Sequence, residues 1–316
     1  MPDPMANPAN SAAGGAMNGT ATYERALAFE CAGERLYGVL SMPTGATSAA
    51  GATARPPTRG VLIVVGGPQY RAGSHRQFTL LARSLAACGI AAMRFDYRGM
   101  GDSEGTLRDF EGVQDDLRAA LDCFYAQVPT LDAVALWGLC DGASAIAFYA
   151  ASDARVRGVA LLNPWVRTEG GAAKATIKHY YRARLFEREL WLKILRGRFN
   201  VGAALGSALS LVRSALRRPQ AGGSSEGGSV ADGAPLPTRM REGLSRFDGR
   251  ILVMLSGADL TAQEFGDLTD GDAAWRRLLD GPRVTRHHLP GADHTCSRRV
   301  WHDQVVDWTC DWMRAW

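Results

Sequence analysis

Short apolar runs rich in branched residues alternate along this chain with patterns typical of helices. The run at residues 60–65 (GVLIVV) is apolar throughout, as is typical of a strand that is buried on both faces. Strands of this kind that alternate with helices form a mostly parallel sheet with helices on both of its faces. After an opening hairpin over residues 26–42, we expect the strands of this sheet at residues 60–65, 90–95, 133–137, 156–162, 251–255 and 284–289.

The alternation is interrupted after residue 163. Two helical patterns, at residues 176–199 and 201–218, are followed by a low-complexity segment at 221–237 (AGGSSEGGSVADGAPLP), which has the composition of a flexible linker. Residues 164–218 contain twelve Lys and Arg but only three Glu, a net charge of +9 in a chain whose total is +4. The basic excess is therefore confined to one inserted segment.

These patterns divide the chain into four parts. Residues 1–22 are rich in Ala, Gly and Asn and lack the basic leader and apolar stretch of a secretory signal, so we expect a disordered tail. We expect the α/β core at residues 23–163 and 241–316. Between its two parts, residues 164–240 would form a helical cap and its flexible linker.

Several classes of protein are excluded. No apolar run approaches the roughly 18–20 residues that a membrane-spanning helix needs. No G-x-G-x-x-G follows the first strand of a βαβ unit, and the histidines lack the spacing of metal ligands, so we expect no metal and no other cofactor. The six cysteines are scattered without a C-x-x-C pair, which favours free thiols and a cytoplasmic location.

The pentapeptide Gly138-Leu139-Cys140-Asp141-Gly142 follows an expected strand and opens an expected helix. This is the setting of a nucleophile elbow, G-x-Nuc-x-G, in which a tight turn presents the nucleophile at the edge of the sheet. The turn needs small residues two positions away, and Gly138 and Gly142 meet that need. A helix N-terminus also stabilises a thiolate. Cys140 is therefore the candidate nucleophile, with a buried core cysteine as the alternative interpretation.

Such a nucleophile needs an acid and a histidine later in the chain, in the order nucleophile, Asp or Glu, His. Asp259 follows the expected strand at 251–255, and His294 follows the expected strand at 284–289. Polar residues at these strand ends collect at one edge of a parallel sheet. We predict His294 as the general base and Asp259 as the residue that orients its ring. Other interpretations stay open: a turn or helix-cap role for Asp259, Asp293 as the acid, and His287, His288 or His302 as the base.

An oxyanion hole needs the backbone N–H after the nucleophile and a second N–H from the loop after the third strand. The first would come from Asp141 and the second from Gly67 or Gln69, because Pro68 has no N–H. A carboxylate facing the nucleophile would oppose thiolate formation, so we expect the Asp141 side chain to point away from the pocket. Candidate substrate-binding residues in and after the same loop are Gln69, His75 and Arg76.

Residues 94–105 (RFDYRGMGDSEG) resemble the D-x-R-G-x-G-x-S turn after the fourth strand of α/β hydrolases, where its role is largely structural. Over most of the expected core, roughly residues 25–165 and 245–316, the chain resembles the first of two α/β hydrolases associated with the exosortase A system in bacteria, whereas the cap and linker carry no such match. This resemblance is carried by residues 66–78 (GGPQYRAGSHRQF), 94–105, 137–144 (WGLCDGAS), 256–265 (SGADLTAQEF) and 292–297 (ADHTCS). It implies an α/β-hydrolase fold and a hydrolase encoded near machinery for protein sorting and exopolysaccharide production.

These features together predict an enzyme that hydrolyses an acyl ester or thioester through Cys140, His294 and Asp259. A similar G-x-C-x-G elbow occurs in dienelactone hydrolases and polyhydroxyalkanoate synthases, and cysteine suits thioester exchange, so a cysteine-dependent acyltransferase is the main alternative. A non-catalytic scaffold or binding protein is the alternative of another class. We expect a small acyl substrate, anionic because of the basic segment, and no nucleic acid. The basic segment is also compatible with peripheral membrane contact.

Overall fold

The computed structural model describes residues 21–44, 56–67, 69–166 and 234–316. The expected helical cap and flexible linker fall largely within residues 167–233, which lie outside the described residues. Most of the expected N-terminal tail, residues 1–20, lies outside them as well. What the sequence predicts for these segments therefore stays a prediction.

In the described part of the chain, eight strands form one sheet in the order β1-β2-β4-β3-β5-β6-β7-β8. The pairs β1–β2 and β2–β4 are antiparallel, and all other neighbouring pairs are parallel. The strands are β1 (Thr22–Cys31), β2 (Glu34–Pro43), β3 (Arg59–Val64), β4 (Ala91–Asp96), β5 (Ala133–Leu139), β6 (Val156–Leu162), β7 (Arg250–Ser256) and β8 (Val284–Leu289). The mostly parallel sheet expected from the sequence is confirmed.

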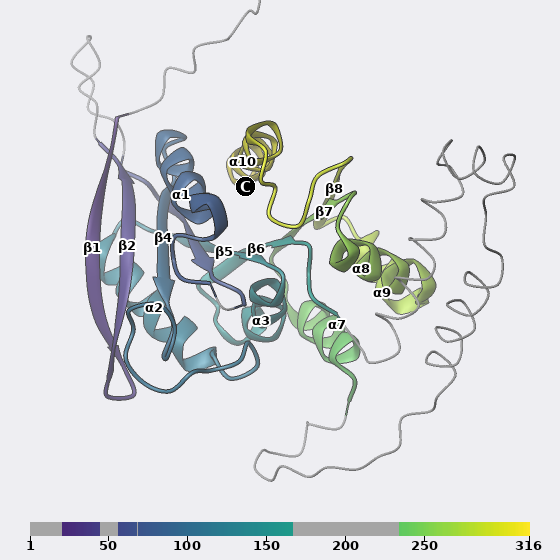
Figure 1. Cartoon of the computed structure of the whole chain (residues 1–316), viewed down its shortest axis with the longest axis horizontal. Coiled ribbons are helices and arrows are strands. Elements are labelled where there is room, and N and C mark those ends of the chain that lie inside the picture. The colour runs from purple at the N-terminus through teal and green to yellow at the C-terminus, as the bar shows by residue number, and fades with distance from the viewer. Residues whose placement is uncertain (1–20, 45–55, 68, 167–233) are drawn as a thin grey trace, which may run out of the picture.

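Helices cover both faces of the sheet (Figure 1). Val61 and Ile63 of β3 pack with α1 and α10 on one face, whereas Leu62 and Val64 pack with α2 on the other. This two-sided burial explains why the strand is apolar throughout. The helices are α1 (Gln77–Ala87), α2 (Gln114–Gln127), α3 (Asp141–Tyr149), α7 (Leu236–Arg246), α8 (Leu260–Gly271), α9 (Ala273–Leu279) and α10 (Arg299–Arg314).

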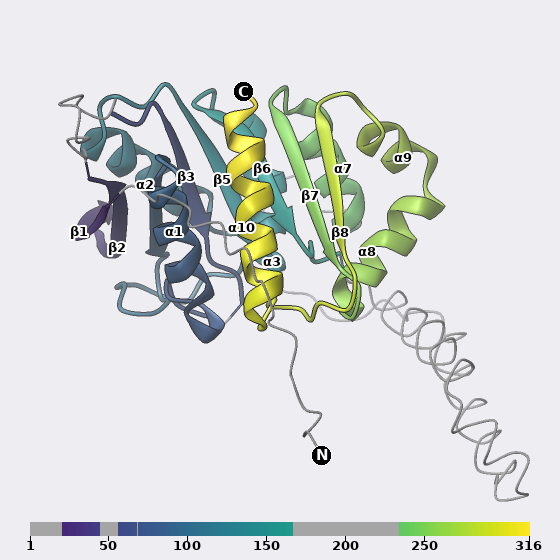
Figure 2. The same ribbon diagram turned by 90° about the horizontal axis from the view of Figure 1, so that it is seen from above.

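The C-terminal helix α10 lies across the central strands (Figure 2). A Cβ added at Gly158 of β6 would come within 2.7 Å of the rings of Trp312 and Trp316, so glycine at this position permits the close approach. No helix among the described residues is both long enough and apolar enough to cross a membrane.

Helix α7 was not predicted from the sequence patterns. It begins inside the range assigned to the cap and linker and packs on α3. A Cβ at Gly243 would lie 2.0 Å from the Ala147 carbonyl oxygen, so this glycine allows the two helices to touch. Pro237 in the first turn suits a helix start, a signal that the surrounding Gly and Ser residues obscured.

The register of the parallel strands sets their carboxyl ends at a common edge of the sheet. Val64 of β3 pairs with Gly138 of β5, and Leu139 at the end of β5 pairs with Leu162 at the end of β6. The loops that leave the strands at this edge contain the polar and glycine residues of the candidate site: Gly67, Cys140, Asn163, Asp259 and His294.

Candidate active site

Cys140 lies in the tight turn between β5 and α3. Its backbone has φ 59° and ψ −125°, a strained conformation for a residue with a side chain. The close packing of the turn leaves no room for larger neighbours, because a Cβ at Gly138 would lie 2.7 Å from the Gly142 carbonyl carbon. The turn has the strained strand-to-helix geometry of a nucleophile elbow. It leaves the thiol of Cys140 partly exposed.

A cleft of about 360 Å³ opens at this turn, and we call it the Cys140 cleft. Phe110, Leu139 and Trp165 form its apolar walls. The other residues that line it are Gly66, Gly67, Gln69, Cys140, Asp141 and His294. Among the described residues, no Lys or Arg lines this cleft, so His294 is its one source of positive charge there.

His294 is held by Asp259, with 2.9 Å between His294 Nδ1 and Asp259 Oδ2. Asp259 is 7 % exposed and also accepts hydrogen bonds from the backbone N–H groups of Thr261 and Ala262, at 3.3 and 3.0 Å. The same carboxylate therefore caps α8 and orients the imidazole, so the two roles considered for Asp259 coexist. The neighbouring Asp293 instead accepts the hydroxyl and backbone N–H of Ser297.

The pKa of the His294 imidazole is raised to about 10. The hydrogen bond with Asp259 is the largest cause, and the interaction with the Cys140 side chain is the second largest. Burial of the ring acts in the opposite direction but is the weaker effect. At neutral pH the ring is therefore protonated and lies between a carboxylate and a thiol. An imidazolium in this position stabilises a thiolate beside it and holds a proton that a leaving group can accept.

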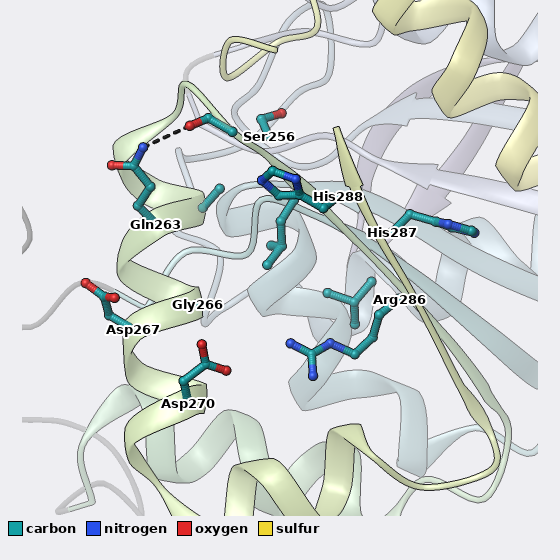
Figure 3. Close-up of a pocket in the computed structure, with 12 residues that line it drawn as sticks. Ser256, Gln263, Gly266, Asp267, Asp270, Arg286, His287 and His288 are labelled. Atoms are coloured by element: carbon teal, nitrogen blue, oxygen red, sulfur yellow. Dashed lines mark hydrogen bonds between the residues drawn. The ribbon is translucent and has the colours of Figure 1, made fainter. Parts of the chain in front are cut away.

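The other histidines considered as bases do not line the Cys140 cleft. His287 and His288 of β8 line a separate cavity of about 340 Å³ against α8 (Figure 3). The ring of His287 stacks on Trp308, with 4.3 Å between the ring centroids. His302 lies on α10, where its Nε2 is 3.3 Å from the Gln77 carbonyl oxygen.

Asp141 is one of the residues that line the cleft, and its carboxylate lies against Gly66 in the loop after β3, although we expected its side chain to face away from the pocket. Its carboxylate accepts backbone N–H groups from Gly67, from Gly142 at 3.0 Å and from Asp141 itself. The carboxylate has room because Gly66 has no side chain: a Cβ there would lie 2.2 Å from Asp141 Oδ1. Burial raises the pKa of this carboxyl above its usual value, against the lowering effect of these N–H groups.

The structure separates the three predicted substrate-binding residues. Gln69 lines the Cys140 cleft, and its Oε1 accepts the backbone N–H of Ser74 at 3.2 Å. His75 and Arg76 are exposed, with φ of 54° and 61°, and neither lines the Cys140 cleft. His75 instead lines a neighbouring cavity of about 400 Å³ beside the loop that follows His294.

The motif at residues 94–105 does not line the Cys140 cleft. It anchors the loop after β3 that contains Gly66, Gly67 and Arg71, which we call the oxyanion loop. Asp96 accepts the Arg71 backbone N–H at 2.5 Å and forms an ion pair with the Arg71 guanidinium, which also pairs with Asp102 at 2.6 Å. Arg98 forms a buried ion pair with Asp116 at 2.8 Å. The motif is therefore structural, and Arg71 is already neutralised by two carboxylates.

Asn163 is a site residue that the sequence analysis missed. It follows β6, is fully buried and has a φ of 48°. Its amide donates to Ser256 Oγ at 2.9 Å and to the His294 carbonyl oxygen at 3.0 Å, and its Oδ1 accepts the Ser256 N–H at 2.8 Å. It thus ties β6 and β7 to the loop that holds the histidine. The position of a polar residue just after a buried strand, which identified Asp259 and His294, could have identified Asn163 too.

The sequence of residues 56–196 matches the Hydrolase_4 family model, described as serine aminopeptidase S33. The matched segment is less than half of the chain; it includes Cys140 and ends before Asp259 and His294. None of the curated proteins compared with the chain matches it significantly.

Solved structures of esterases are similar to this chain over almost its whole length. The esterase Pf2001 from Pyrococcus furiosus has a TM-score of 0.59 at 12% identity, covering 93% of this chain and 91% of its own. Est1E from Butyrivibrio proteoclasticus, with ferulic acid bound, has a TM-score of 0.58 at 14% identity and coverages of 91% and 99%. The esterase domain of a Rhodothermus marinus protein has a TM-score of 0.56 at 18% identity, with coverages of 93% and 98%. At such identities the likeness establishes the fold, and with the sheet order and the elbow it shows that the chain has the α/β-hydrolase fold.

Proposed function

We propose that this chain is a hydrolase that cleaves an acyl ester or thioester. Cys140 is the nucleophile, His294 moves the proton, and Asp259 orients the ring of His294. The observation that carries the proposal is that His294, which hydrogen-bonds Asp259 at 2.9 Å, lines the same apolar-walled cleft as Cys140, whose side chain helps to raise the pKa of the imidazole. The esterase fold neighbours support the same reaction class.

The reaction proceeds in two stages. The Cys140 thiolate attacks the acyl carbon, a C–S bond forms, and the carbonyl oxygen becomes an oxyanion. The intermediate collapses as the bond to the leaving alkoxide or thiolate breaks, and the His294 imidazolium protonates that group. The neutral imidazole then removes a proton from water, whose oxygen attacks the thioester of the acyl-enzyme. The free acid leaves, and Cys140 regains its thiolate with His294 protonated.

A high pKa of the histidine favours cysteine chemistry of this kind. With the imidazole pKa near 10, a neutral histidine base is scarce at neutral pH, whereas a thiolate–imidazolium pair needs the protonated ring. A thiolate also exchanges readily with thioesters, so an acyl thioester suits Cys140 as a substrate. An acyltransferase would use the same residues with another acceptor in place of water. A binding protein would have no need of the strained elbow or of a histidine held between Cys140 and Asp259.

The sequence resemblance suggests a cellular role next to exosortase-linked protein sorting or exopolysaccharide production, with a small acyl compound as the substrate. The scattered cysteines favour a cytoplasmic location. Selectivity for an anionic substrate would come from the basic segment at residues 164–218, because the described lining of the Cys140 cleft has no Lys or Arg. The same segment would provide any peripheral membrane contact.

The test compares acyl release from p-nitrophenyl acetate and from an acetyl thioester by the wild type, by Cys140→Ala and by Cys88→Ala. Cys88 is the matched control, because a hydrogen bond with Cys310 lowers the pKa of its thiol to about 7 and it does not line the Cys140 cleft. We expect Cys140→Ala to lose about 10³-fold or more of kcat, by analogy with other nucleophile deletions, and Cys88→Ala to retain wild-type activity. Turnover that survives Cys140→Ala would reject the proposal. Repeating the assay with added amines, alcohols or thiols identifies the acceptor.

A further inference from the structure

The carboxylate of Asp141 lies against the backbone donors expected to bind the substrate oxyanion. Its Oδ1 packs on the Cα of Gly66 and accepts the N–H of Gly142 at 3.0 Å, and the N–H groups of Gly67 and of Asp141 itself also lower the pKa of this carboxyl. Gly67 and Asp141 are the pair from which an oxyanion hole at this elbow would be built. Asp141 also lines the Cys140 cleft beside the nucleophile.

The fit of this carboxylate is specific. Oδ1 lies so close to the Cα of Gly66 that a Cβ at that position would be 2.2 Å away, so the oxyanion loop is shaped around it. N–H groups that donate to a carboxylate make stronger hydrogen bonds than those that donate to a neutral carbonyl oxygen. An ester or thioester carbonyl in its ground state is therefore the weaker ligand for these donors.

A substrate carbonyl and the Asp141 carboxylate cannot both occupy the hole. Each N–H has one hydrogen to donate, and the developing oxyanion needs those of Gly67 and Asp141. The side chain of Asp141 must therefore rotate away before the acyl carbon reaches the sulfur of Cys140. The free energy of this displacement has to come from contacts that the substrate makes elsewhere in the cleft.

We propose that Asp141 is a specificity-determining residue that closes the oxyanion hole of the resting enzyme and opens it only to acyl donors that bind strongly enough to displace it. The proposal rests on the proposed function, with Cys140 as the nucleophile. In a cleft of about 360 Å³, this closure would slow the reaction of Cys140 with generic small esters relative to larger acyl donors. Small activated esters, which lack further contacts, should react slowly with the wild type.

Asp141 has a second effect that the test must separate from the first. Its negative charge also acts on the neighbouring thiol, so its removal could speed any reaction of Cys140 by favouring the thiolate. Alkylation by iodoacetamide depends on the thiolate but forms no oxyanion, whereas acylation by p-nitrophenyl acetate needs the thiolate and the hole. The ratio of the acylation rate to the alkylation rate therefore reports on access to the oxyanion hole alone.

The experiment measures both rates at Cys140 for the wild type, Asp141→Ala, Asp141→Asn and Asp293→Ala, with labelled peptides identified by mass spectrometry. Asp293→Ala is the matched control, because it removes a carboxylate next to His294 that pairs with Ser297 and does not line the cleft. We expect Asp141→Ala to raise the acylation-to-alkylation ratio at least about tenfold. Asp141→Asn retains the shape and a neutral acceptor, so its ratio should rise less. Asp293→Ala should leave the ratio unchanged.

Two results would overturn the proposal in distinguishable ways. If the wild type is acylated at Cys140 but the ratio stays constant or falls in Asp141→Ala, Asp141 does not close the hole, and the proposed function stands. If iodoacetamide labels Cys140 but no variant is acylated there, the proposed function fails together with the closure. Circular dichroism and thermal unfolding of each variant check its fold, and Asp141→Asn still decides the question if Asp141→Ala does not fold.

Discussion

Asp259 does two things with one carboxylate: Oδ2 lies 2.9 Å from His294 Nδ1, and the same group accepts the N–H donors of Thr261 and Ala262 at the start of α8. The catalytic histidine is thus oriented by a residue that a helix terminus already fixes. Stability and catalysis are coupled at this position, and suitable substitutions can separate them.

The first prediction separates the contribution of Asp259 to stability from its contribution to catalysis. Asp259→Asn should keep the helix cap, because Asn caps a helix as well as Asp does. The lost charge should lower kcat by about 10³–10⁴-fold. Asp259→Ala should lose the same activity and, in addition, about 1 kcal/mol of the free energy of unfolding. Kinetics and urea denaturation of both variants give the comparison. Equal stability of the two variants would show that the cap contributes nothing.

The second prediction is a pH profile. Because the pKa of His294 is raised to about 10, the imidazolium needed by the leaving group persists through neutral pH, and kcat/KM should decline only above pH 9 to 10. A histidine with its ordinary pKa of 6.5 that acts first as a neutral base would instead give activity that rises through that pH. The profile of kcat/KM between pH 6 and 11 with a neutral ester distinguishes the two.

The same shift has a consequence for stability. The folded state holds the His294 proton more tightly than the unfolded state, in which the histidine has its ordinary pKa of 6.5. The resulting stabilisation is complete below pH 6.5, shrinks as the pH rises and is lost above about 10. The difference in the free energy of unfolding between wild type and His294→Gln should therefore shrink over that interval. A constant difference would contradict the raised pKa.

The third prediction concerns Asn163. Asn163→Ala removes the anchor of the His294 loop and leaves the Ser256 N–H unsatisfied in the core, which should cost about 1–3 kcal/mol of the free energy of unfolding. It should also lower kcat about tenfold with little change in KM, because the histidine is less well held. An unchanged kcat in Asn163→Ala would remove Asn163 from the positioning of His294.

The fourth prediction tests the basic segment at residues 164–218. An anionic short-chain thioester should be turned over more slowly as ionic strength rises, while a neutral p-nitrophenyl ester responds little. The double substitution Arg182→Glu and Arg184→Glu should raise KM for the anionic substrate alone. Equal salt sensitivity of the two substrates would make the basic charge ordinary surface charge.

Part of this arrangement could be predicted from the sequence because it depends on local signals. Apolar runs predicted the parallel strands, because these strands are buried on both faces of the sheet. Asp259 and His294 were predicted because each is a polar residue shortly after such a strand. The glycines around Cys140 marked its turn because the turn leaves no space for a Cβ.

The remaining features depend on contacts between distant segments. The direction of Asp141 is decided by Gly66, which lies in another loop and leaves the space for its carboxylate. Arg71 lies in the loop after β3, and its charge is neutralised by Asp96 and Asp102 from the following strand and turn. His75 and Arg76 follow the oxyanion loop in sequence, yet the turn at residues 73–76 directs them away from the cleft. Local patterns carry no signal for such pairings.

The central claim, that Cys140 becomes acylated during turnover, is tested most directly by the intact mass of the protein quenched in acid during reaction with an acyl thioester. We predict a species heavier by one acyl group, with the added mass on the peptide that contains Cys140 and absent from Cys140→Ala. It should accumulate in His294→Gln, because no base remains to activate water for deacylation. Turnover of the thioester without any acylated Cys140 peptide, in wild type and in His294→Gln alike, would contradict the claim.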